Sequence, residues 1–278
     1  MDNVSRERKT ILKPTTGWAT LNLRDMWLYR ELIFFMTWRD LKVRYKQTLL
    51  GVGWAILQPF MTMVVFSIFF GNLAAVPSDG VPYPIFSYTA LIPWTLFSKA
   101  LQDASRSLVN NSHMITKVYF PRMILPVSSV LAGVVDFLIA FIVLLGLMVY
   151  YKITPTANTW ALPLFLILAV ITAIAVGLWL SALNVLYRDI NYVLPFLTQF
   201  WMYLTPIAYP SSMVPERWRA VYALNPMTGV VEGFRWALLG TAKPPGLMTL
   251  VSAGVAVVLL ISGMFYFKRM ERLFADRV

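Results

Sequence analysis

The sequence contains no cysteine and a single histidine, and only 13% of its 278 residues are charged. The absence of cysteine excludes disulfides, thiolate zinc sites, iron–sulfur clusters and cysteine nucleophiles. Charged residues make up about 25% of a typical soluble domain, whereas 58% of this chain is hydrophobic. Because so few charges could not cover so much apolar surface in water, the composition predicts an all-α integral membrane protein.

Catalytic motifs are missing as well. The chain has no Gly-x-x-x-x-Gly-Lys-Ser/Thr phosphate-binding loop, no Gly-x-Ser-x-Gly elbow and no His-Glu-x-x-His zinc motif. Its one histidine, His113, falls in a short connection. We therefore expect no metal site and no catalysis in this chain. A membrane enzyme that uses carboxylates alone is the alternative, but no acidic pair converges at either mouth.

Long intervals without Asp, Glu, Lys or Arg are the strongest signal in the sequence. A helix needs about 20 apolar residues to cross the hydrocarbon core of a bilayer. Six transmembrane helices are predicted, at residues 53–73, 84–106, 123–149, 162–186, 191–209 and 246–267.

The basic residues indicate the orientation. Ten Lys and Arg lie in residues 1–46 and four in 268–277, whereas the connection 74–83 has none and 151–161 has only Lys152. By the positive-inside rule both termini are cytoplasmic, which agrees with an even number of spans. The net charge of +11 is then a signature of the inner leaflet, and we expect no nucleic-acid partner.

Three segments outside the spans carry further predictions. In residues 22–46, bulky apolar side chains recur at helical spacing among charges, which predicts an amphipathic helix in the cytoplasmic interface; an ordinary solvated helix is the alternative. Residues 110–121 form a short cytoplasmic connection with apolar side chains, typical of a partner site; a tight connection packed on its own spans is the alternative. Residues 211–243 contain helices too short to cross, broken at Pro215 and at Asn225–Pro226, and a re-entrant pair is favoured over a plain loop.

Polar residues inside the spans form one stripe. Helical spacing puts five of them on one face of the second span, namely Lys99, Gln102, Asp103, Arg106 and Asn110. Since charges avoid lipid, this polar stripe faces a hydrated path, a packed ionic lock within the bundle, or the cytosol if the helix protrudes. Asp136 is the only charge in the third span. Counting residues along the predicted spans puts Asp136 nearer the outer face and Lys99 nearer the inner face, so we expect that the two do not pair.

The fifth span presents aromatic and amide side chains on one face. This aromatic stripe consists of Tyr192, Phe196, Gln199, Phe200 and Tyr203. Aromatic rings can stack on sugar C–H surfaces, although such spacing is more often helix packing.

Four blocks of sequence resemble the polysaccharide-exporting ABC-2 permeases, above all the Wzm-type permeases of O-antigen export. They are WRDLKVRYKQTLLG at 38–51, ITKVYFPR at 115–122, YRDI at 187–190 and LNPM at 224–227. The resemblance covers nearly the whole chain, in the order that the family shows.

The resemblance implies an ABC-2 permease fold and a domain plan. Residues 1–50 would be a cytoplasmic segment with an interfacial gate helix, and 51–278 a six-span domain. Within that domain, about 110–121 would be a coupling helix and about 212–240 the re-entrant gate helices on the outer side. The ATPase-coupling residues would be His113, Met114, Ile115, Lys117, Tyr119 and Phe120.

The resemblance also implies partners and a substrate. The chain would form a homodimer in the bacterial inner membrane, with two copies of a cytosolic P-loop ATPase that binds the ATP and Mg²⁺. The substrate would be a polysaccharide on undecaprenyl pyrophosphate. We expect the pyrophosphate near four entrance residues, Arg39, Lys42, Arg44 and Arg188, with inner-leaflet anchoring as the alternative. The glycan path would include Trp54, Trp94 and the aromatic stripe.

Other functions stay open at this point. Export of teichoic acid, of capsule, or of a small molecule such as a drug or haem would use the same fold. An ATP-independent carrier would often show internal repeats, and no clear self-similarity is present.

Overall fold

The structure, a computed structural model, describes residues 23–46, 51–241 and 244–277, with side chains for 26–46, 51–241 and 244–274. Residues 1–22 and 47–50 of the predicted N-terminal segment lie outside the described residues, as does the side chain of Arg277. All regular structure in the described part is helical. Its elements are α1 (Leu23–Leu28), α2 (Arg30–Lys46), α3 (Gly53–Phe66), η1 (Ser67–Leu73), α4 (Tyr83–Asn110), α5 (Ser112–Lys117), α6 (Ile124–Tyr150), η2 (Ala157–Ala161), α7 (Leu162–Leu186), α8 (Ile190–Leu204), η3 (Ser211–Met213), α9 (Glu216–Ala223), α10 (Pro226–Leu239) and α11 (Leu247–Arg277).

Four helical stretches of the described residues are long and apolar enough to cross a membrane: Gly53–Leu73, Ile124–Tyr150, Ala157–Leu186 and Leu247–Phe274. They coincide with four of the six predicted spans. The other two predicted spans correspond to α4 and α8. The polar stripe makes α4 less apolar, and the 15 residues of α8 rise only about 22 Å at 1.5 Å each.

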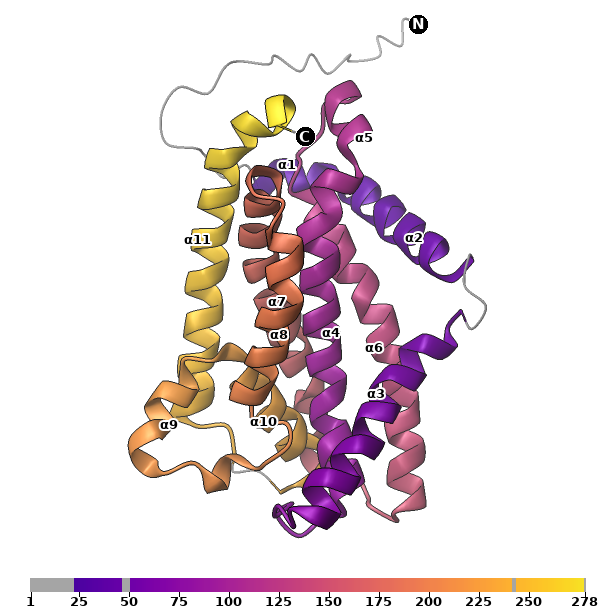
Figure 1. Cartoon of the computed structure of the whole chain (residues 1–278), viewed down its shortest axis with the longest axis vertical. Helices are drawn as coiled ribbons and strands as arrows, with labels where there is room; N and C mark the ends of the chain where they lie inside the picture. The colour runs from indigo at the N-terminus through magenta and orange to yellow at the C-terminus, as the bar shows by residue number, and fades with distance from the viewer. Residues whose placement is uncertain (1–22, 47–50, 242–243, 278) are drawn as a thin grey trace, which may run out of the picture.

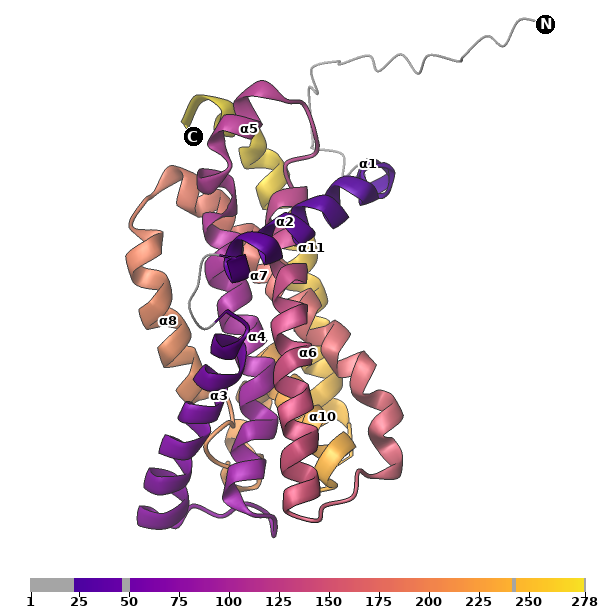
Figure 2. The same cartoon turned by 90° about the vertical axis from the view of Figure 1, so that its right-hand side faces the viewer.

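The bundle is built around α4, which packs on α6 and α7, while α11 packs on α7. Figure 1 shows the long helices running side by side, with α5 and the C-terminal end of α11 at one end of the bundle and with α9 and α10 at the other. Figure 2 shows the same division from the side. We refer to these as the α5 end and the α10 end.

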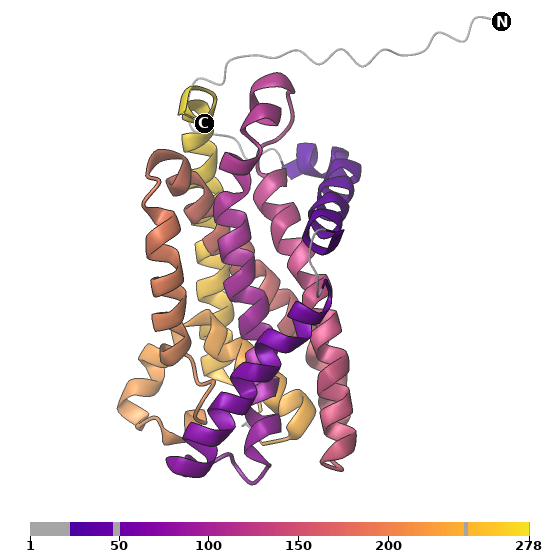
Figure 3. The same cartoon turned by 45° about the vertical axis from the view of Figure 1, so that its right-hand side comes forward.

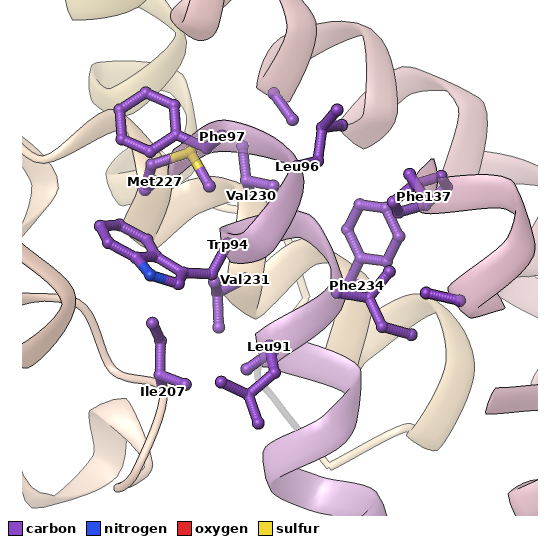
Figure 4. Packing of buried hydrophobic residues seen from close by; sticks show 14 of the residues in the cluster. Leu91, Trp94, Leu96, Phe97, Phe137, Ile207, Met227, Val230, Val231 and Phe234 are labelled. Carbon is purple, nitrogen blue, oxygen red and sulfur yellow. The ribbon is translucent and has the colours of Figure 1, made fainter. Parts of the chain in front are cut away.

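Part of the core forms where α10 packs beside α4 (Figure 4). Phe234 of α10 meets Phe137 of α6 edge to face, with ring centroids 5.7 Å apart. Glycines permit this close approach: a Cβ at Gly229 would lie 2.8 Å from the Cβ of Ser252, and a Cβ at Gly233 would collide with the Phe165 ring. Side chains larger than hydrogen are therefore excluded at both positions.

The breaks in the predicted re-entrant segment are where the sequence predicts them. Pro215 precedes α9, and the Asn225 side chain caps α10 by accepting from the Met227 amide at 3.1 Å. Gly240 ends α10 in the left-handed conformation, φ 68°. Most of α10 is buried, so it belongs to the core and is no surface loop.

Candidate functional site

The helix α2 lies across α6 near the α5 end and differs from the predicted helix in one respect (Figure 1). Its apolar side chains occupy two opposite faces instead of one. Leu32, Ile33 and Met36 pack against the bundle, while Phe34 and Trp38 on the other side are 64% and 60% exposed. One face therefore binds protein and the other is free to contact lipid headgroups and acyl chains.

Polar side chains on the inward face of α2 connect it to α6. Thr37 donates to the carbonyl of Ser128 at 3.4 Å, and Ser129 donates to the Asp40 carboxylate at 3.3 Å. Asp40 is also held by Arg39 at 2.8 Å. Further along the same face of α2, Arg44 makes shorter, charged contacts.

Arg44 joins three helices. Its guanidinium donates to Asp136 of α6 at 2.7 Å and to Asp103 of α4 at 2.6 Å. Lys99 of α4 lies 3.9 Å from the same Asp136 carboxylate. Two cations and two carboxylates, with the hydroxyl of Tyr45 donating to Asp136, form a cluster that we call the charged junction (Arg44, Tyr45, Lys99, Asp103 and Asp136).

The prediction that Asp136 and Lys99 do not pair is wrong. The helix α4 continues to Asn110, four residues beyond the predicted end of that span. Lys99 thus lies 11 residues, about 16 Å, from the α5 end of α4, and Asp136 lies 12 residues, about 18 Å, from the same end of α6. The two side chains therefore lie at about the same depth in the bundle. The predicted end of the span at residue 106 had placed Lys99 too close to the inner face.

The charged junction is neutral overall and partly open to solvent. The side chain of Asp136 is 9% exposed, whereas those of Arg44 and Asp103 are 26% and 43% exposed. Burial, together with the bond to the Asp136 carboxylate, raises the pKa of the Tyr45 phenol above its ordinary value of 10.0. Tyr45 is therefore a neutral donor at physiological pH, and Arg44 supplies the charge that Asp136 needs.

The polar stripe of α4 continues from the junction toward α8. The Arg106 guanidinium donates to Asn191 at 3.2 Å, and Asn191 donates to Asn184 of α7 at 2.9 Å. Gln102 is half-buried and Asn110 is exposed. The stripe thus faces both α2 and α8, and it is partly paired and partly accessible to water.

The four predicted entrance residues do not form one cluster. Arg39 and Arg44 are engaged by the carboxylates already described, and Lys42 is exposed on α2. Arg188 is exposed in the turn between α7 and α8. Sequence reasoning assigned no site role to Tyr45 or Asp40. The bond from Tyr45 to Asp136 and the bond from Ser129 to Asp40 both depend on the contact between α2 and α6.

The predicted coupling segment, residues 113–120, consists of the short helix α5 and an irregular connection that begins with extended backbone at Val118. Ile115 and Phe120 are 5% exposed and anchor it in a second apolar cluster, with Met114 packed against that cluster. The other predicted coupling residues, His113, Lys117 and Tyr119, are exposed. The segment forms the tip of the α5 end (Figure 1).

The predicted glycan-path residues also divide into exposed and buried side chains. All five members of the aromatic stripe are exposed on α8, with Tyr192 at 84% and Phe196 at 72%, and Trp54 on α3 is 52% exposed. Trp94 is 4% exposed. It packs beside Phe97 and faces the α10 core (Figure 4), so it lines no surface of the described chain.

A second charged site, missed by sequence reasoning, lies at the α10 end. Arg235 is 1% exposed and donates to the carbonyls of Pro206 and Ile207 at 2.6 and 2.8 Å. Its guanidinium stacks 3.6 Å from the Phe86 ring centroid, and Glu232 lies 3.3 Å away. These carbonyls are free because α8 ends at Leu204, before Pro206.

No group of three or more His, Asp or Glu suited to a metal ion occurs among the described residues. The charged junction contains two carboxylates, but both accept from Arg44, so they serve as ion-pair partners between helices.

Comparison with known proteins agrees with this architecture. The sequence matches the ABC-2 type transporter family over residues 31–239. It is 27% identical to the O-antigen export system permease protein RfbA of Myxococcus xanthus, over 92% of this chain and 98% of the relative. The RfbA protein of Klebsiella pneumoniae is 29% identical, over 88% and 94%. The polysialic acid transport protein KpsM of Escherichia coli is 24% identical, over 84% and 91%.

Proposed function

The chain belongs to the ABC-2 type transporter family, and we propose that it is the membrane subunit of an ABC transporter that exports lipid-linked polysaccharide across the bacterial inner membrane. The substrate is a glycan on undecaprenyl pyrophosphate, an O-antigen in the first instance. ATP hydrolysis takes place in a separate subunit, and this chain performs no catalysis.

The match to O-antigen export permeases along almost their full length carries this proposal. A polysialic acid transporter also matches, at lower identity. Both relatives are named for polymeric glycans. An exporter of capsule or teichoic acid is the nearest alternative, and an exporter of drugs or haem would share the fold without the polymer.

In the proposed topology α3, α4, α6, α7, α8 and α11 cross the membrane, and both termini are cytoplasmic. The α5 end is then the inner end and the α10 end the outer one. Support comes from α1 and the C-terminal end of α11, which lie at the same end of the bundle (Figures 1 and 2). The helices α9 and α10 would enter and leave from the outer side as a re-entrant pair.

The active unit in this proposal is a homodimer. Helices α3 and α8 both pack on α4, and both present apolar side chains that the single chain leaves uncovered, such as Trp54 and Phe196. Figure 3 shows the two helices on neighbouring sides of α4. A second copy facing them would enclose a path lined by the aromatic stripe, on which sugar rings could stack.

The charged junction suits the proposed gate. Arg44 is held by carboxylates of two other helices, and an incoming pyrophosphate would compete for it through charge-assisted hydrogen bonds. Release of Arg44 would loosen α2 from α4 and α6 and admit the lipid-linked glycan. Lys42, exposed on the same helix, would attract the headgroup toward the inner leaflet.

Loss of the chain tests the function directly. Removing it from its bacterium should abolish long-chain surface polysaccharide and leave undecaprenyl-linked glycan inside the inner membrane, and reintroducing the wild-type chain should restore export. Gel electrophoresis measures the surface polysaccharide, and mass spectrometry measures the undecaprenyl-linked glycan. Unchanged surface polysaccharide would exclude the proposal, and a transport defect limited to a small molecule would favour the drug or haem exporter.

A matched pair of variants tests the proposed ATPase contact. Tyr119 and Phe120 are neighbours, but Tyr119 is 69% exposed and Phe120 is 5% exposed. We expect Tyr119→Ala to leave the melting temperature unchanged and to reduce the recovery of a P-loop ATPase with the purified chain. Phe120→Ala should destabilise the fold by about 3 kcal/mol. Full ATPase recovery with Tyr119→Ala would argue against this segment as the docking site.

A further inference from the structure

The helix α11 is longer than one membrane crossing requires. Its first 21 residues, 247–267, contain no Asp, Glu, Lys or Arg, and they rise about 32 Å at 1.5 Å each, which matches a hydrocarbon core of about 30 Å. The helix then continues through residues 268–277. Leu273 lies six residues, about 9 Å, beyond Phe267, whereas the headgroup layer on one side is only about 5–8 Å thick. In the proposed topology Leu273 therefore lies past the membrane surface, at the α5 end.

Apolar packing attaches this inner extension of α11 (residues 268–274) to the predicted coupling segment. Phe274 is fully buried and meets Phe267, two turns earlier, edge to face with ring centroids 5.2 Å apart. Both rings belong to the apolar cluster that also contains Ile115 and Phe120 of the coupling segment. Protein, and not lipid, therefore covers the inner extension on this side.

Hydrogen bonds provide a second attachment. The guanidinium of Arg122, which follows the coupling segment, donates to the Glu271 carbonyl at 2.6 Å, and the Arg122 amide donates to the Glu271 carboxylate at 3.4 Å. Lys268 pairs with the same carboxylate at 2.6 Å. The inner extension and the coupling segment are thus joined by apolar and polar contacts, and Figures 1 and 2 show both at the α5 end.

The other face of the inner extension is exposed. Helical spacing puts Arg269, Arg272 and Leu273 on the side away from Phe267 and Phe274, and all three are exposed. The arginines are charged at any physiological pH, so this face combines positive charge with an apolar side chain.

The exposed side chains of the coupling segment have the same character. Lys117 is exposed there, and Val118 and Tyr119 are 57% and 69% exposed. Residues 113–122 contain no acid, and the inner extension contains only Glu271, which the contacts above already engage. The two segments together therefore present a basic, partly apolar surface, which is complementary to an acidic patch on a protein.

We propose that the inner extension of α11 and the coupling segment form one docking surface, and that the ATPase subunit contacts it with an acidic patch. This inference rests on the proposed function, in which a separate subunit hydrolyses ATP, and it adds a second contact to the one predicted from the sequence. Anionic headgroups are the competing occupant for the arginines. They do not account for Leu273, which lies beyond the headgroup layer.

A photo-crosslinker tests the position of this docking surface. p-Benzoylphenylalanine replaces Leu273 or, as a matched control, Leu250, which is an exposed leucine at the other end of the same helix. The same substitution at Tyr119 reports on the coupling segment. The tagged full chain is irradiated in the membranes of its own bacterium, purified and analysed by mass spectrometry for peptides of a P-loop ATPase. We expect ATPase adducts from positions 273 and 119 and none from position 250.

Charge reversal tests the chemistry of the contact. Arg269→Glu is compared with Lys152→Glu, which changes an exposed cation on the connection between α6 and η2 at the α10 end. Each purified chain is placed in nanodiscs of phosphatidylcholine, with or without phosphatidylglycerol, and titrated with the ATPase that copurifies with the wild-type chain. Arg269→Glu should raise the Kd about tenfold in both lipids, because it puts a like charge opposite the acidic patch. Lys152→Glu should leave the Kd unchanged, and both variants should melt like the wild type because both sites are exposed.

Three results would overturn the docking surface. Position 273 could give no more ATPase adduct than position 250, Arg269→Glu could bind the ATPase as tightly as the wild type does, or its loss of affinity could be confined to discs with phosphatidylglycerol, which would assign Arg269 to lipid. Each of these leaves the proposed function intact if the wild-type chain still recovers the ATPase. A wild-type chain that recovers no P-loop ATPase contradicts the proposed function itself.

Discussion

The two charged sites of the molecule stabilise arginine in different ways. Arg235, at the α10 end, is 1% exposed and donates to the backbone carbonyls of Pro206 and Ile207. Arg44, in the charged junction, is 26% exposed at its side chain and donates to carboxylates on two separate helices. Backbone carbonyls cannot move without unfolding the chain, whereas carboxylates on different helices can separate. We therefore expect Arg235 to be structural, and the proposed gate assigns the role of a switch to Arg44.

The largest effect is expected at the structural site. Arg235→Met should destabilise the fold by about 3–5 kcal/mol, because it leaves the carbonyls of Pro206 and Ile207 buried without donors and removes the cation paired with Glu232, which keeps only the bond from Ser211. Arg219→Met is the matched control, since Arg219 makes one pair with the exposed Glu216 and such pairs contribute about 0–1 kcal/mol. Thermal unfolding followed by tryptophan fluorescence, with the yield of monodisperse protein, measures both. Equal stability of the two variants would remove the contrast between the sites.

An intermediate effect is expected at the charged junction. Arg44→Gln should cost about 1–2 kcal/mol of stability, since the pair with Asp136 is mostly buried and the pair with Asp103 is screened by solvent. If α2 is a gate, export should fall by far more than the loss of folded protein can explain. A double-mutant cycle with Asp136→Asn gives the coupling energy, which we expect to be about 1–3 kcal/mol.

The control for this cycle is Arg39→Gln, because the partner of Arg39 is Asp40 on the same helix. Its removal should change neither the attachment of α2 to the bundle nor the coupling between Arg44 and Asp136. Additive effects of Arg44→Gln and Asp136→Asn would show that the junction does not hold α2. Wild-type export by a stable Arg44→Gln chain would exclude the gate.

The same contrast shows which features the sequence can predict. Charge-free intervals and proline breaks predicted the helices and the starts of α9 and α10, since these depend on local composition. The polar stripe was found because helical spacing fixes it. The partners of Asp136 could not be found, because Arg44 is 92 residues away in sequence and an error of four residues in the end of α4 changes the depth of Lys99.

Burial against protein or lipid was also beyond sequence reasoning. Trp94 and Phe196 are both large aromatic side chains, but α10 covers Trp94, whereas Phe196 on α8 stays exposed. A hydrophobic pattern identifies a side chain that avoids water and does not say which apolar surface it meets. Arg235 was missed for a related reason: its partners are carbonyls, which every residue has.

The smallest effect, and the sharpest test of the junction's chemistry, is expected from Tyr45→Phe. The phenol donates to Asp136 beside Arg44, so its loss should cost about 1 kcal/mol and leave the ion pairs in place.

The raised pKa of Tyr45 also determines the direction in which its contribution to stability changes with pH. The unfolded phenol loses its proton near pH 10 while the folded one keeps it, so the stabilisation by Tyr45 is complete below pH 10 and decreases above it. The difference in melting temperature between wild type and Tyr45→Phe should thus be constant from pH 7 to 9 and narrow toward pH 11. Other titrating groups cancel in this difference because both chains contain them. A gap that widened with pH would mean that Tyr45 ionises more readily in the fold than in the unfolded chain, which is incompatible with a neutral donor to Asp136.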